Sequence, residues 1–310
     1  MTHPQVSLPA SLTVIERDWL CANHILLRGG SGNVLVDTGY VTESAETLRR
    51  VQALLGDETL ALIVNTHVHS DHVGGNATLQ RQYGCPIAVP EGEAAALREW
   101  DEKLLLLAYS GQASERFDFQ ETLSAGKHYG WGDLDWLALA APGHDMGALV
   151  FYERSLGLLI SGDALWEHGF GFVLPPSIDP RCLPATRATL EMLARLPLKV
   201  VLPGHGKPFA EPAAALERCF KRLEAFEADE TRLARHALRV VLTFALLAHK
   251  RMALATLPAY LDGIGLYRDF NARFFSWTPE ALAEWLVMEL EKSGVAKREG
   301  GFLHAIQGGG

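Results

Sequence analysis

Short apolar runs alternate with segments of helical periodicity along the first 211 residues. The runs at residues 60–65, 137–141, 158–160 and 200–202 predict buried strands, as do parts of residues 12–37 and 87–89. Apolar positions at helical spacing predict a helix over residues 43–55, ended by Gly56, and another over about residues 72–83. Periodicity alone therefore indicates a mixed α and β fold for this part of the chain.

The pattern changes after residue 209, where helical periodicity dominates. Leu216, Phe220, Leu223 and Phe226 form an apolar stripe, and further helices are predicted at 233–247, 254–262 and 279–292, the last capped by Thr278. Residues 295–305 predict a small hairpin that turns at Gly300 and Gly301, and residues 308–310 are expected to lack order. We therefore divide the chain into residues 1–211 and a smaller, mostly helical domain at 212–310.

Composition places this chain among ordinary globular proteins. Its 310 residues are 48% hydrophobic, and its longest uncharged apolar run, at 240–248, is too short to span a bilayer. Residues 1–10 have no basic segment followed by an apolar one, so no signal peptide is expected. The four cysteines are scattered without a Cys-x-x-Cys pair, which is typical of reduced thiols in the cytoplasm.

The charge distribution argues against a nucleic-acid partner. Residues 1–211 hold 15 basic and 25 acidic side chains, whereas residues 212–310 hold 13 and 12, for a net charge of −9 overall. Neither part is the basic surface that drives binding to phosphate backbones. A small-molecule partner is expected instead, and a homodimer is left open.

The segment from Thr66 to Gly75 is the most informative part of the sequence. It contains His67, His69, Asp71 and His72 within six positions, and packing alone gives no reason to crowd such residues together. If the chain leaves a strand at Thr66, His67 and His69 project to one side because side chains repeat every two residues. Asp71 and His72 then point toward a second position, and imidazole and carboxylate ligands suit zinc and its first-row neighbours.

Three later candidate ligands each follow an apolar run and a glycine. His144, Asp163 and His205 come directly after Gly143, Gly162 and Gly204, where a sharp strand-to-loop turn needs a permissive backbone. A single histidine after a glycine is usually an ordinary loop residue. The joint pattern is what indicates a metal site, because all of these residues sit at predicted strand ends.

The His-x-His-x-Asp-His motif at residues 67–72 resembles the signature of the metallo-β-lactamase superfamily. The similarity continues through Asp37-Thr38-Gly39 and the motifs ending at His144, Asp163 and His205, and it covers about residues 12–210. The resemblance implies an α/β fold, a four-layer αββα sandwich, with His67, His69 and His144 on one metal and Asp71, His72 and His205 on the other. It further implies that Asp163 bridges the two ions and that Asp37 supports the histidine-rich loop by hydrogen bonds.

What the resemblance implies chemically is hydrolysis by hydroxide held between two divalent ions. Zinc is our first choice, with iron and manganese as alternatives. Asp71, or a water, would return the proton to the leaving group. The presence of Asp163 favours the glyoxalase II, lactonase and phosphodiesterase branches over true β-lactamases, and Trp166 stands where quorum-sensing lactonases tend to have tyrosine. A small ester, thioester or lactone-like substrate is therefore expected.

The segment after the bridging aspartate is predicted to line the substrate pocket. It contains Trp166, His168, Phe170 and Phe172, which suggest a partly apolar substrate, although His168 is interpreted more readily as a packed or surface residue. Aromatic residues within 101–133 could also form a pocket wall, but we favour a role in covering the core.

Two other functions are weighed against this hydrolase. The helices and hairpin of residues 212–310 resemble the winged-helix appendage of some superfamily members, which suggests an endoribonuclease-like phosphodiesterase or a DNA-binding regulator. Because the segment has no basic recognition helix, we favour a structural role for it.

Overall fold

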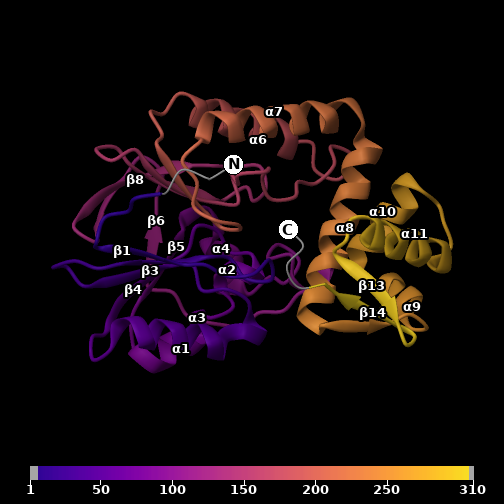
Figure 1. Cartoon of the computed structure of the whole chain (residues 1–310), viewed down its shortest axis with the longest axis horizontal. Helices are drawn as coiled ribbons and strands as arrows, with labels where there is room; N and C mark the ends of the chain where they lie inside the picture. The colour runs from indigo at the N-terminus through magenta and orange to yellow at the C-terminus, as the bar shows by residue number, and fades with distance from the viewer. Residues whose placement is uncertain (1–5, 307–310) are drawn as a thin grey trace.

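Two β-sheets, with the helices that cover them, form the larger part of the chain, and a mostly helical unit follows them (Figure 1). The computed structural model describes residues 6–306, so the expected disorder at residues 308–310 lies outside the described part. The first sheet has the order β1 (Leu12–Ile15), β2 (His24–Leu27), β3 (Asn33–Val36), β4 (Leu60–Val64), β5 (Ile87–Pro90) and β6 (Glu121–Leu123). The second has the order β11 (Val200–Pro203), β10 (Leu158–Gly162), β9 (Leu149–Glu153), β8 (Leu134–Ala140) and β7 (His128–Trp131).

The two sheets pack face to face through alternate residues of their strands. In β3, Val34 and Val36 lie in the core between the sheets, whereas Leu35 faces the outer helices. The second sheet contributes Trp136 and Phe151 to the same inner core, and both side chains are fully buried. This alternation follows from the two-residue period of a strand.

Helices cover the outer face of each sheet. On the first sheet these are α1 (Ser44–Leu55), α3 (Asn76–Tyr83) and α4 (Ala94–Glu99), and on the second they are α6 (Cys182–Ala194) and α7 (Pro212–Ala228). The expected four-layer αββα sandwich is therefore confirmed. Shorter helical turns are η1 (Val41–Glu43), η2 (Glu91–Glu93) and α5 (Leu107–Ser110).

The helix predicted over residues 72–83 is in fact two helices. A short α2 (Ser70–Val73) ends at Gly74, and α3 begins after Gly75. A Cβ on Gly74 would lie 2.2 Å from the Val41 backbone nitrogen, and one on Gly75 would lie 2.4 Å from the Thr38 carbonyl oxygen. The glycine pair thus lets the histidine-rich segment pack directly on the backbone that follows β3.

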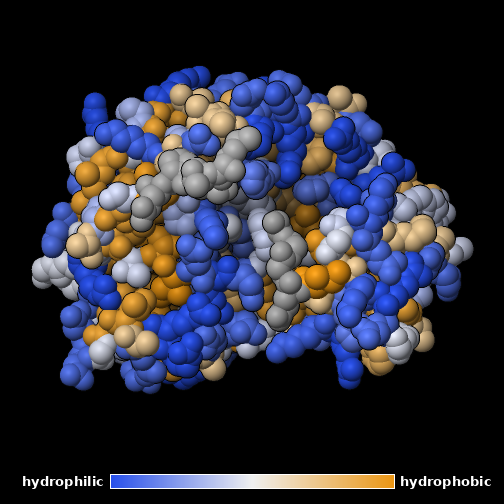
Figure 2. Space-filling model, viewed as in Figure 1, coloured by the Kyte–Doolittle hydropathy of each residue, from blue (hydrophilic) through white to orange (hydrophobic). Residues whose placement is uncertain are grey.

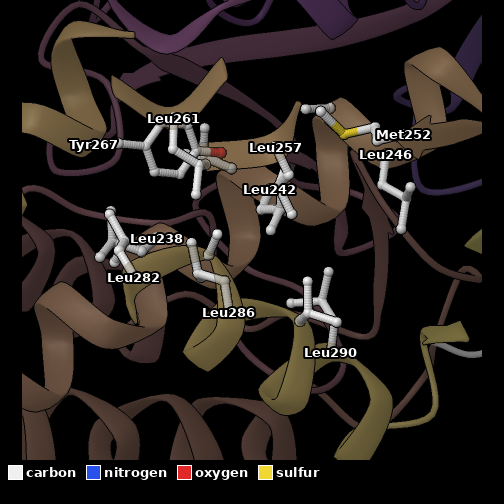
Figure 3. Packing of buried hydrophobic residues seen from close by; sticks show 14 of the residues in the cluster. Leu238, Leu242, Leu246, Met252, Leu257, Leu261, Tyr267, Leu282, Leu286 and Leu290 are labelled. Atoms are coloured by element: carbon white, nitrogen blue, oxygen red, sulfur yellow. The ribbon is translucent and has the colours of Figure 1, made fainter. Parts of the chain in front are cut away.

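The remaining chain builds a second hydrophobic core (Figure 3). It comprises α8 (Glu230–His249), β12 (Arg251–Ala253), α9 (Leu257–Gly263), α10 (Gly265–Phe274), α11 (Pro279–Lys292), β13 (Ala296–Glu299) and β14 (Phe302–Ala305). The predicted hairpin is confirmed, because Glu299 pairs with Phe302 across Gly300 and Gly301. The three strands have the order β12-β14-β13. The winged-helix interpretation remains a prediction.

Helix α7 contributes to the core of the sandwich, and the division of the chain at residue 211 stays a prediction. The apolar stripe of α7, including Leu216, Leu223 and Phe226, packs on the sandwich, and the second core begins at Ala234 in α8. Across the junction, the Tyr40 ring meets Phe244 edge-on with centroids 5.0 Å apart. Within residues 6–306, no helix combines the length and the apolar content needed to cross a bilayer.

The aromatic residues of 101–133 belong to these cores. Phe117 lies under the helices of the first sheet, and Tyr129 and Trp131 stack beside the inner core of the sandwich. Tyr109 donates a hydrogen bond of 2.9 Å to Asp269 Oδ2 in α10 and so ties this segment to the C-terminal unit. These residues therefore cover and connect the cores, as favoured from the sequence.

Candidate metal centre

The histidine-rich loop is held by a carboxylate from the neighbouring strand. Asp37 follows β3, which pairs in parallel with β4, so both chain ends emerge at the same sheet edge. Asp37 Oδ1 accepts the Thr66 backbone N–H at 2.9 Å, and its Oδ2 accepts the Thr66 hydroxyl at 2.8 Å. Oδ2 also lies 2.8 Å from His72 Nδ1. Asp37 thus fixes both the start of the loop and the orientation of one imidazole.

Seven side chains from four strand ends converge into two adjacent groups. Their ligand atoms lie within 4.8 Å of one another inside each group, which consist of His67, His69 and His144, and of Asp71, His72, Asp163 and His205. In the first group, His69 Nδ1 and His144 Nε2 are 2.7 Å apart. In the second, His205 Nε2 is 3.0 Å from Asp71 Oδ2. The structure therefore brings together every residue that the sequence nominated as a ligand.

Asp163 stands between the two groups. Its Oδ1 lies 3.3 Å from His72 Nε2 and 3.8 Å from His205 Nε2, while its Oδ2 lies 3.4 Å from His144 Nε2. One carboxylate therefore faces both groups, with one oxygen toward each. This is the arrangement that a bridging ligand requires.

The chemistry of the donor atoms fits a pair of divalent cations. His67 Nε2 and His72 Nε2 are buried and have no hydrogen-bond partner among the described residues. A buried polar nitrogen without a partner carries a desolvation cost of about 1–3 kcal/mol. A cation coordinated at these atoms would remove that cost, and nitrogen and carboxylate ligands suit zinc, iron or manganese.

The pKa shifts of two histidines in the first group also favour metal ligation. Burial, followed by the nearby His72 and His69, lowers the pKa of His67 well below its usual value, and burial lowers the pKa of His69 to about 4. Both imidazoles are therefore neutral near pH 7, as a metal ligand must be. At His72 burial lowers the pKa, but Asp37, Asp163 and Asp71 outweigh it and raise the pKa well above its usual value. Burial raises the pKa of Asp163, but His72 and His205 outweigh it and hold that carboxyl ionised, with a pKa well below its usual range.

Several supporting contacts were not predicted from the sequence. The Phe172 carbonyl lies 2.6 Å from His144 Nδ1, and the Thr66 hydroxyl lies 3.1 Å from His67 Nδ1. Asp145 Oδ2 lies 3.7 Å from His69 Nε2. Such contacts orient ligand imidazoles. Asp145 directly follows a nominated ligand and could have been suspected, whereas a backbone carbonyl gives no signal in the sequence.

Two tryptophans stand beside the second group. Trp166 donates its indole N–H to Asp163 Oδ1 at 3.2 Å. Trp19 stacks parallel to the His205 ring, with centroids 5.5 Å apart and an interplanar angle of 3°, and meets Trp166 edge-on at 5.5 Å. Because 41% of Trp19 remains exposed, it offers a free apolar face next to the site. Trp19 lies far from every motif, so the sequence did not nominate it.

The other residues expected to line the pocket lie in three different environments. Phe172 is half-buried and meets the His144 ring edge-on at 5.6 Å. Phe170 is buried in the core between the second sheet and its helices, where it meets Phe226. His168 lies at the surface with 77% of its side chain exposed. The bridge between Trp166 and Gly169 forms a tight turn that directs His168 outward.

Comparison with known proteins agrees with this geometry. The family model described as Metallo-beta-lactamase superfamily matches residues 18–205. Human Acyl-coenzyme A thioesterase MBLAC2 is 28% identical over 211 residues, covering 61% of this chain and 74% of that protein. Hydroxyacylglutathione hydrolase from Ectopseudomonas mendocina is 33% identical over 116 residues, covering 37% of each chain.

Solved structures support the fold. A metallo-beta-lactamase family protein from Thermus thermophilus has a TM-score of 0.57 and 24% identity, covering 97% of this chain and 100% of its own. The class B3 di-zinc metallo-beta-lactamase LRA-12 from an Alaskan soil metagenome has a TM-score of 0.54 and 18% identity over 73% of this chain and 99% of its own. Since the family match spans more than half of the sequence, the chain belongs to the metallo-β-lactamase superfamily.

Proposed function

We propose that this protein is a dinuclear metal-dependent hydrolase that cleaves a small thioester. The observation that carries the proposal is the position of Asp163, whose two carboxylate oxygens face the two groups of candidate ligands. A single carboxylate shared in this way supports two cations held close together rather than one isolated structural ion.

Two divalent ions at this site would supply Lewis-acid polarisation of the substrate oxygen and a water of lowered pKa. His67, His69 and His144 would hold one ion, and Asp71, His72 and His205 the other, with Asp163 shared. In addition to its place in the second group, we assign Asp71 the return of a proton to the leaving group. Burial raises the pKa of Asp71, but His72 and His205 outweigh it and lower the pKa overall, so Asp71 is ionised and can accept that proton first.

The choice of a thioester rests on the relatives and on the apolar wall. One of the two relatives described above is named as a thioesterase of acyl-coenzyme A, and the other as a hydrolase of hydroxyacylglutathione. Trp19 and Trp166 form an aromatic corner beside His205, which suits an acyl chain or another apolar group next to the scissile bond. Esters and lactones contain the same reacting carbonyl and stay within the proposed class.

Elemental analysis followed by a substrate panel tests this function. We expect about two zinc, iron or manganese ions per chain. The panel contains acyl-coenzyme A and acylglutathione thioesters, simple esters, lactones and a phosphodiester, the last because it is the substrate class of the endoribonuclease-like alternative. Asp163→Asn should lower kcat/KM by about 10²–10³-fold, since the ions contribute several kcal/mol. Asp57→Asn, at an exposed position, is the matched control.

Three outcomes would contradict the proposal. One is a purified protein that binds no metal when loaded with each ion in turn. Another is thioesterase activity that Asp163→Asn leaves unchanged. The third is cleavage of the phosphodiester alone, which would instead revive the nuclease alternative.

A further inference from the structure

A basic pocket lies at the corner where α7 meets α8, outside the candidate metal centre. It has a volume of about 360 Å³, and its lining residues come from the end of α7 and the first turns of α8: Lys221, Arg222, Ala225, Phe226, Arg232, His236 and Arg239. Figure 1 shows the two helices meeting there at a steep angle, and Figure 2 shows hydrophilic side chains along this edge of the molecule.

The lining is positively charged and contains no carboxylate. Lys221 and Arg239 each have an acidic partner, Glu217 at 2.6 Å and Glu289 at 3.0 Å. The guanidinium groups of Arg222 and Arg232, in contrast, make no ion pair or side-chain hydrogen bond with any residue between 6 and 306. Arg222 and Arg232 therefore carry positive charges in the pocket that no acidic side chain among the described residues neutralises.

Partial burial makes the positive charge of Arg222 energetically unfavourable. The side chain is half-buried, and burial lowers its pKa. Burial also lowers the pKa of His236 to about 3, helped by Arg222 and Arg239, so this imidazole stays neutral beside the cations. A partly buried cation without a partner is unfavourable because it loses part of its hydration, and an anion placed against it would offset that loss.

The pocket is also held in a defined shape. A Cβ on Gly169 would lie 2.1 Å from Arg222 Nη1, so the guanidinium rests directly on the backbone of that loop. On the other side, the Phe226 ring packs against His236 with centroids 5.2 Å apart. Arg222 is therefore positioned before any ligand arrives, which reduces the entropic cost of binding.

We propose that this pocket binds a phosphate group. Two unpaired guanidinium forks on adjacent helices match the several acceptor oxygens and the double negative charge of phosphate better than a single carboxylate would. The bound phosphate group could belong to free phosphate, to diphosphate, or to a nucleotide-type carrier. The proposal does not depend on the thioesterase function, because none of the pocket residues is a candidate metal ligand.

Binding measurements on the metal-loaded protein test this assignment. Isothermal titration at constant ionic strength would use orthophosphate, diphosphate and adenosine 3′,5′-bisphosphate. Arg232→Gln and Arg222→Gln should each weaken binding by about 10-fold or more, since charged hydrogen bonds make a large contribution to affinity. Arg195→Gln removes a surface charge from the end of α6 and is the matched control.

The two arginine variants also separate this pocket from the metal centre, which could itself attract phosphate. A phosphate affinity that falls in both variants but not in Arg195→Gln supports the proposal. A preference for the bisphosphate would then identify a nucleotide-type carrier, and equal affinity would identify a free anion. The proposal is overturned if no ligand binds, or if Arg232→Gln binds all three as tightly as the unaltered protein. Arg232 is exposed, so its replacement keeps the test valid even if Arg222→Gln fails to fold.

Discussion

Asp37 Oδ2 lies 2.8 Å from His72 Nδ1, so the aspartate after one strand orients an imidazole delivered by the next. The same carboxylate accepts the backbone N–H and the hydroxyl of Thr66. His72 Nε2 therefore faces Asp163, while His72 Nδ1 is hydrogen-bonded to Asp37. Support of this kind raises the basicity of a ligand and limits its motion.

Replacing Asp37 should weaken metal binding without removing a ligand. In Asp37→Asn the amide nitrogen cannot accept the His72 Nδ1–H, so we expect the affinity for the more weakly held ion to fall about 10–100-fold. Chelator competition followed by metal analysis measures this directly. The exposed Asp57→Asn should behave like the unaltered protein. An Asp37→Asn protein with unchanged affinity for both ions would show that the hydrogen bond has no role in ligation.

Trp19 should contribute to substrate binding rather than to folding. Its stacked position on His205 leaves 41% of the residue exposed beside the site. Trp19→Ala should raise KM for a long-chain acyl thioester by about 10-fold, because loss of an aromatic contact is worth about 1–2 kcal/mol. The melting temperature and the metal content should change little.

Met288→Ala is the control for that experiment, because Met288 is 50% exposed on α11 and lies in the C-terminal unit. Its KM should equal that of the unaltered protein. A Trp19→Ala enzyme whose KM is unchanged for both long and short acyl groups would remove Trp19 from the substrate site.

Glu93 should make stability depend on pH. Burial raises the pKa of Glu93 to about 9, and the neighbouring Asp145 contributes to that rise. The folded protein therefore holds a proton that the unfolded chain releases at its ordinary pKa of 4.5. Since the folded state binds more protons between these values, the free energy of unfolding should fall as pH rises from about 5 to 9.

Glu93→Gln should flatten that decline. Glutamine keeps an acceptor for the Gly147 backbone N–H and offers an N–H toward Asp145 at every pH. Melting temperatures of the two proteins should be similar near pH 5, with the variant more stable near pH 8. The prediction is wrong if the two curves stay parallel across this range.

Tyr267 carries a buried hydroxyl that has no hydrogen-bond partner among the described residues. Tyr267→Phe removes that group and leaves the ring in place. We therefore expect unchanged or higher stability, by up to about 1 kcal/mol or roughly 2–4 °C in the melting temperature.

Tyr109→Phe is the comparison for Tyr267, because the Tyr109 hydroxyl donates to Asp269 at 2.9 Å. This variant should be equally stable or less stable than the unaltered protein. Thermal unfolding measures both variants. A clear loss of stability in Tyr267→Phe would indicate that its hydroxyl has a partner, such as an ordered water.

The sequence alone determined the mixed fold and nominated the metal centre. Strand and helix periods report which side of each element is buried, and glycine followed by histidine or aspartate marked three of the strand ends. The seven candidate ligands that now lie together, from His67 to His205, could be recognised because their types and spacing are local properties. The hairpin at Gly300 and Gly301 was visible for the same reason.

Only the tertiary structure shows which side chains that are distant in the sequence lie together. Trp19 stacks on His205, Arg222 and Arg232 line one pocket where two helices meet, and α7 packs on the sandwich. The sequence grouped Phe170 and His168 in one segment and favoured a packed or surface position for His168. The turn at Gly169 directs Phe170 into the core and His168 to the surface. Local pattern specifies how each element is oriented toward a core, whereas the long-range packing of elements specifies which side chains share a site.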